Sequence, residues 1–63
     1  MLDINGVELT IGDKVCYVKG KNSDARLAVG NITKIYPSKH YGVDEECSVD
    51  GNAHILPFRI MKL

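Results

Sequence analysis

Bulky and cross-linking side chains are scarce in this chain of 63 residues. It contains no Trp, one Phe and two Cys, and no apolar run approaches the ~20 residues that span a bilayer. Small secreted domains that depend on disulfides carry more cysteines, and the start "MLDINGVEL" lacks both parts of a signal peptide. We therefore expect a complete, small cytoplasmic protein with free thiols and no membrane partner.

An excess of charge of either sign is also missing. Eight basic residues balance eight acidic ones, whereas a domain that binds nucleic acid mainly through bulk charge is usually strongly basic. A chain of this length forms one domain, residues 1–63, and buries only about 60% of the surface that its unfolded chain exposes. Because so small a core leaves no room for a deep catalytic pocket, we expect a protein that is not an enzyme.

Motifs for cofactors and metals are absent as well. No phosphate-binding glycine motif occurs, and the glycines fall at expected turns or bends. Zinc would suit Cys16, His40, Cys47 and His54, but neither CxxC nor HxxxH spacing is present, so no local chelate forms. The acidic residues near the carboxyl end match no calcium loop. We expect neither a metal nor a cofactor.

What the chain does contain is a series of short β-branched and apolar runs separated by Gly, Asn, Asp and Pro. No apolar pattern of helical period extends over eleven positions, so the chain is expected to be all-β. Asn5-Gly6 predicts a type I′ hairpin with arms at 2–4 and 7–9. Further strands are expected at 14–19, 26–36, 40–44, 53–56 and 59–63, with 45–49 either continuing the third of these or forming its own.

Five or six such strands, several of them bent, would be protected best if the sheet closed into a small barrel. Because Ile32 and Ile35 are three residues apart, both can point inward only if a bulge lies between them. The expected core consists of Val7, Leu9, Val15, Tyr17, Val29, Ile32, Ile35, Val43, Val49, Ile55, Ile60 and Leu63.

The motifs "IGDKVCYVKG", "VGNITKIY", "YGVD" and "LPFRIMKL" together resemble the SH3-like small barrels, in particular the KOW and Tudor-like branch. The resemblance covers residues 9–63 and implies a 3₁₀ turn before a short last strand, with the amino-terminal hairpin as an addition. Proteins with this fold have many functions. The chain is also similar to small accessory proteins of bacteriophages, which would place it in the host cytoplasm.

In SH3-like barrels two loops flank one groove, and that groove is the usual ligand site. The resemblance therefore implies a groove that combines basic and aromatic side chains, which suit nucleic acid or a protein surface. Simple solvated lysines and a Tyr that caps the barrel are the plainer alternative. The expected groove residues are Lys19, Lys21, Arg26, Tyr36, Lys39, His40 and Tyr41.

A block of carboxylates follows the expected groove residues in the sequence. We expect it at the opposite end of the barrel, either as a solvated edge or as an acidic patch that docks a basic partner. Zero net charge would then hide two opposite patches. The block comprises Asp44, Glu45, Glu46 and Asp50.

The sequence thus favours a binding module whose partner is a host or viral protein. The alternative is a KOW-like domain that binds nucleic acid through the basic and aromatic groove. Either is expected to be a monomer or a weak homodimer.

Overall fold

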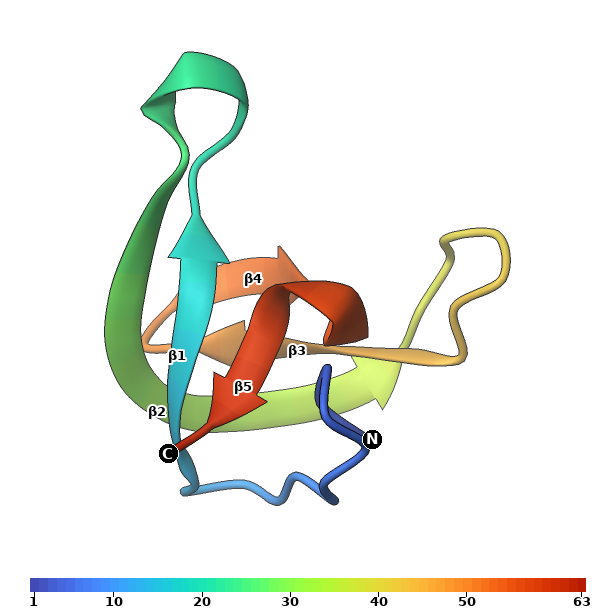
Figure 1. Ribbon diagram of the computed structural model, residues 1–63. Coiled ribbons are helices and arrows are strands. Elements are labelled where there is room, and N and C mark those ends of the chain that lie inside the picture. Colours follow the sequence, from blue (N-terminus) through green and yellow to red (C-terminus); the bar gives the residue numbers. More distant parts are fainter.

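Five antiparallel strands form the fold, as a computed structural model that describes all 63 residues shows (Figure 1). The strand order is β4-β3-β2-β1-β5, and a 3₁₀ turn precedes the last strand, so the all-β prediction and this turn are confirmed. The elements are β1 (Lys14–Lys19), η1 (Asn22–Asp24), β2 (Arg26–Pro37), β3 (Glu45–Val49), β4 (Asn52–Ile55), η2 (Pro57–Arg59) and β5 (Ile60–Lys62).

The sheet does not close into a barrel through hydrogen bonds. The outer strands β4 and β5 do not pair with each other, and the segment between them is occupied by η2. Closure was expected because it removes exposed strand edges. The structure instead leaves an open seam between β4 and β5. None of its helical segments is long and apolar enough to cross a membrane.

The long strand β2 curves through the whole molecule and belongs to both halves of the sheet (Figure 1). Its first half pairs with β1 from Lys19↔Arg26 to Lys14↔Asn31, and its second half pairs with β3. The register shifts between Ile32 and Lys34, which confirms the bulge predicted from the spacing of the two isoleucines. Ile32 is buried and Ile35 packs against the core from a partly exposed position.

Gly30 allows β2 to lie directly under the β3–β4 turn. A Cβ atom on Gly30 would lie 2.5 Å from Oδ2 of Asp50 and 2.8 Å from Cγ1 of Val49, distances that no side chain tolerates. Asp50 and Gly51 form the two-residue turn, and both have positive φ, as a type I′ turn requires. The missing side chain of Gly30 therefore leaves room for the side chains of Asp50 and Val49 over β2.

The core contains most of the residues expected there. Val7, Val29 and Leu63 are nevertheless exposed and Val43 is only partly buried, while Cys47, which was not among the expected core residues, is fully buried. Val29 faces outward because it pairs with Cys16 on the side of the sheet opposite the core. The buried apolar residues are Leu9, Val15, Tyr17, Ile32, Cys47, Val49, Ile55 and Ile60.

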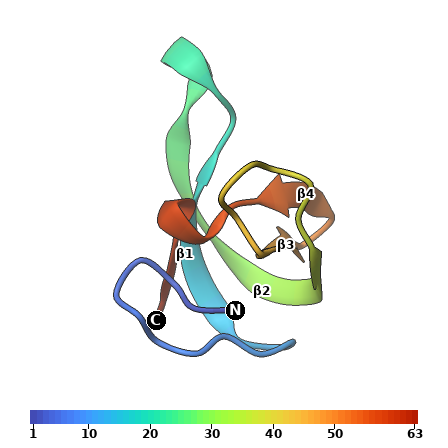
Figure 2. The same cartoon turned by 90° about the vertical axis from the view of Figure 1, so that its right-hand side faces the viewer.

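The amino-terminal hairpin differs from the predicted type I′ turn. The Asp3 N–H donates to the Val7 carbonyl, the Gly6 N–H donates to the Asp3 carbonyl, and within this loop only Gly6 has positive φ, so the loop has three residues. The predicted strands are reduced to a single β-bridge between Leu2 and Glu8. The buried Asp3 carboxylate accepts N–H groups from Asn5, Val7 and Lys62. It thereby fastens the hairpin to β5, beside which it lies in Figure 2.

The strand predicted at 40–44 is wrong. Residues 38–44 form a projecting loop, closed by a hydrogen bond from the Ser38 N–H to the Asp44 carbonyl (Figure 1). Gly42 adopts φ +76°, which interrupts an extended chain, and Tyr41 is fully exposed. The alternation of Tyr41 and Val43 therefore reflects a loop, and β3 begins only at Glu45.

Substitutions at adjacent positions of β1 should distinguish its two faces. Val15 is completely buried and Cys16 faces outward, so Val15→Asp should leave the chain unfolded, because it buries an unpaired charge in a domain with only a few kcal/mol to lose. Circular dichroism and an amide NMR spectrum measure the outcome, with Cys16→Ser as the folded control. A folded Val15→Asp protein would show that the strand register is wrong by one residue.

Candidate functional site

Two hollows have His54 in both of their linings, and together they are called the groove below. The first, of about 500 Å³, lies at the open seam between β4, η2 and the upper end of β1. The second, of about 270 Å³, lies under the projecting loop. The polar residues that line the groove are Lys19, Lys21, Asn52, His54 and Arg59 in the first hollow, and Tyr36, Lys39, His40 and Glu46 in the second.

Five of the seven predicted groove residues thus line one or the other of the two hollows. Lys19 and Lys21 lie in one hollow, and Tyr36, Lys39 and His40 in the other. Arg26 lines neither hollow but pairs across the ribbon with Lys19, and Tyr41 extends from the loop into solvent. The polar groove residues that were not predicted as such are Glu46, Asn52, His54 and Arg59.

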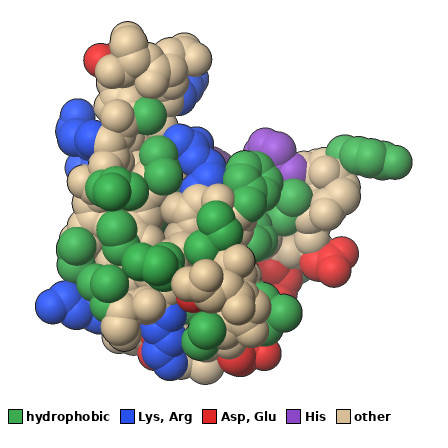
Figure 3. Space-filling view, in the orientation of Figure 1, with side chains coloured by type: hydrophobic (Ala, Val, Ile, Leu, Met, Phe, Trp, Pro, Cys, Tyr) green, Lys and Arg blue, Asp and Glu red, His purple; other side chains and the backbone are tan.

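The cations around the first hollow have no carboxylate partners. Lys19 and Arg26 lie directly opposite each other on paired strands, an arrangement that repels. The Arg59 guanidinium donates to the Gly20 carbonyl at 3.1 Å and so stays beside the Lys19–Lys21 segment. None of these cations forms a salt bridge, and Figure 3 shows blue side chains gathered along this upper part of the molecule. The groove therefore presents uncompensated positive charge.

Glu46 forms the floor of the second hollow. Its side chain is only 4% exposed, Nδ1 of His54 lies 2.6 Å from one carboxylate oxygen, and the Ser38 hydroxyl donates to the other at 2.8 Å. Nδ1 of His40 lies 3.4 Å from the carboxylate oxygen that accepts the Ser38 hydroxyl. The hydrogen bonds from His54 and then Ser38 hold the pKa of Glu46 below its usual 4.5, and they outweigh burial, which acts in the opposite direction.

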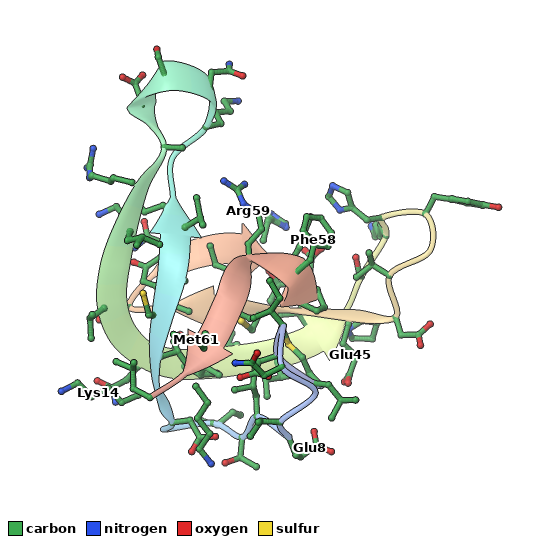
Figure 4. The ribbon with its side chains drawn as sticks, viewed as in Figure 1. Glu8, Lys14, Glu45, Phe58, Arg59 and Met61 are labelled. Atoms are coloured by element: carbon green, nitrogen blue, oxygen red, sulfur yellow. The ribbon has the colours of Figure 1, made fainter.

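This position corrects the expectation that Glu46 belongs to a solvated acidic patch far from the basic loops. Its neighbours in the sequence do not form one patch either. Asp44 is exposed, Glu45 pairs with the terminal amino group at 3.1 Å, and Asp50 accepts the Asn31 N–H beside the β3–β4 turn. The carboxylates near the amino terminus are Glu8 and Glu45, which lie on the lower side of Figure 4, away from Arg59.

His54 is held at the junction of the two hollows by contacts on three sides. Its backbone N–H donates to the Tyr36 hydroxyl at 2.8 Å, and the two rings meet edge to face with centroids 6.1 Å apart. Its φ of +64° is uncommon for a residue with a side chain and costs about 1–3 kcal/mol. The contacts with Tyr36 and Glu46 keep it in this conformation and orient the imidazole, which remains largely exposed to the groove.

The thiols lie apart from the groove surface. Cys47 and the partly exposed Cys16 are both free, and burial, together with the neighbouring Glu46 carboxylate, raises the pKa of the Cys47 thiol to about 11. Cys47 is therefore a protonated core residue at neutral pH. No group of three or more His, Cys, Asp and Glu side chains is arranged to hold a metal ion.

Comparison with known families gives one match. Residues 1–46 match the family described as Domain of unknown function (DUF7205). The chain belongs to this family. The DUF7205 match includes β1, β2 and the start of β3, and ends at Glu46, whereas His54 and Arg59 follow it in the sequence. No curated protein and no solved structure matches the chain.

Acid should weaken the fold partly through Glu46. Because its pKa is lowered in the folded state, Glu46 contributes stability above its unfolded value of 4.5 and loses that contribution as the pH falls through the folded pKa. In urea unfolding, Glu46→Gln should be less stable than wild type at about pH 6, and the difference should shrink at about pH 3. Asp44→Asn, which removes an exposed carboxylate, should follow wild type throughout. An equal loss in both variants would contradict the role given to Glu46.

Proposed function

We propose that this domain is a non-enzymatic protein-interaction module whose groove docks an extended, acidic segment of a partner. The observation that carries this proposal is the location of the first hollow. It lies along the outer strand β4 and is bordered by Lys19, Lys21 and Arg59, none of which has a carboxylate partner. An incoming strand would find main-chain groups at the free edge of β4 and positive charge opposite them.

The free strand edge favours a protein over nucleic acid as the partner. Peptides can add to a sheet edge through main-chain hydrogen bonds, while their side chains supply specificity. Carboxylates at alternate positions of such a peptide would face the unpaired cations of the groove. The buried Glu46 and the zero net charge of the chain also limit how many phosphates the domain could neutralise.

We propose more specifically that the fold is an SH3-like barrel with an open seam. The support is the strand order, the bent β2 shared by both halves of the sheet, and the 3₁₀ turn before the last strand. We also propose that the chain is a phage-type or bacterial accessory protein that acts in the cytoplasm as a monomer or weak homodimer. The partner would then be a host or viral protein.

Nucleic acid remains the second candidate because aromatic and basic side chains are combined in the groove. Tyr36 lines the second hollow together with Lys39, and the fully exposed Tyr41 lies two residues further along the same loop. Exposed aromatic side chains can stack with bases while the cations contact phosphates. Such binding would weaken steeply as salt is added.

A charge-reversal pair tests both candidates. The double variant Lys21→Glu/Lys39→Glu alters one cation in each hollow, and Lys14→Glu/Lys34→Glu makes the same change in net charge outside the groove. The probes are a short fluorescent peptide in which Glu alternates with Thr, and a single-stranded oligonucleotide, each followed by fluorescence polarisation. We expect peptide affinity to fall about tenfold or more in the groove variant only.

Each outcome of that titration decides between the candidates. Peptide binding that survives in the control variant and is lost in the groove variant supports the protein-docking function. Oligonucleotide binding with a steep salt dependence, and no peptide binding, would replace it with the second candidate. Equal effects of the two double variants would contradict a specific role for the groove.

A further inference from the structure

We propose that the outer face of β5, β1 and β2 is a second docking surface, which takes an apolar protein segment with a carboxylate near each end. This surface, called the outer face below, lies on the opposite side of the β1–β2 ribbon from Val15 and shares Val18 and Arg59 with the lining of the first hollow. The proposal does not rest on the groove function, although Arg59 borders both surfaces. Its residues are Ile4, Cys16, Val18, Leu27, Val29, Phe58 and Met61.

Strand pairing aligns these side chains on one side of the sheet. Cys16 pairs with Val29 on one side and with Met61 on the other, and Val18 pairs with Leu27. Since side chains alternate along a strand, all of these point away from the core, on the face opposite Val15 and Tyr17. The outer face is therefore two adjacent rows of apolar cross-strand neighbours.

Much of this apolar surface is exposed to solvent. Leu27 is 74% exposed, Phe58 59% and Val29 56%, and the face forms a shallow hollow of about 210 Å³. Figure 3 shows several groups of green side chains on the front of the molecule. Contiguous apolar patches with a polar rim are typical of protein-binding surfaces, whereas single exposed apolar residues are ordinary. Within the folded chain these side chains therefore remain exposed.

Charge at the two ends of the outer face indicates which molecule fits. Lys14 lies at one end and Arg59 at the other, with Met61 between them (Figure 4). Neither cation forms a salt bridge with any carboxylate of the chain. A segment with apolar side chains in its middle and Asp or Glu near each end would match both the patch and its rim.

The same charges argue against a second copy of this chain as the occupant. Two-fold pairing of two outer faces sets either like ends or opposite ends against each other. Because both ends carry a cation, each arrangement places positive charge against positive charge. Like charges facing one another across an interface disfavour association. The occupant is therefore a different protein.

Photo-cross-linking from the outer face tests this proposal. Leu27 is replaced by p-benzoylphenylalanine, the protein is irradiated in bacterial lysate, and the cross-linked peptides are sequenced. Ile11, which is 66% exposed but lies outside the face, carries the same photoreactive residue in the control. Amide NMR spectra establish that each labelled protein is folded.

The expected product is a cross-link to one apolar segment of another protein, with Asp or Glu on both sides of the apolar residues. Adding Val29→Asp to the Leu27-labelled protein should lower the yield about tenfold, and Lys14→Glu should lower it less. The groove variant Lys21→Glu/Lys39→Glu should leave it unchanged, so failure here is separable from failure of the groove function. Cross-links to a second copy of the chain, to segments without carboxylates, or equally from Ile11, would overturn the proposal.

Discussion

At Gly30, side chains from the β3–β4 hairpin approach β2 more closely than an unshifted Cβ atom there would permit. Asp50 and Val49 occupy the space that a Cβ atom would need, and the bulge after Ile32 then turns the strand from one half of the sheet to the other. In a domain of 63 residues, one bent strand allows both halves to enclose a single core. The positions of both proposed binding surfaces follow from that bend.

On the concave side of the bent β2, β4 lies beside the upper part of β1 and does not pair with β5. The open seam is therefore also the site of the groove, with unpaired cations on one side and the Glu46–His54 pair near its centre. Outside the bend, the straight part of the sheet has nothing packed against it and exposes apolar rows. Protein binding at the groove would cover the unpaired cations and the free edge of β4, and binding at the outer face would cover the exposed apolar rows.

Local patterns in the sequence predicted the local structure well. The range 14–19 and the bulge implied by Ile32 and Ile35 match the structure. Position 29 was assigned to the wrong face because alternation cannot be followed through a bent strand. The groove roles of Glu46 and His54 were not predictable, since they depend on a contact between separate strands and on an unusual backbone conformation at His54.

The most direct measurement of this account is the free energy of unfolding of Gly30→Ala, determined with urea. A methyl group at position 30 would lie against Val49 and Asp50, so we expect a loss of about 1–3 kcal/mol, and amide shifts along the β3–β4 hairpin. The double variant Gly30→Ala/Val49→Ala should be more stable than the sum of the two single losses implies. Wild-type stability with unchanged spectra in Gly30→Ala would contradict the close approach on which the fold and both surfaces depend.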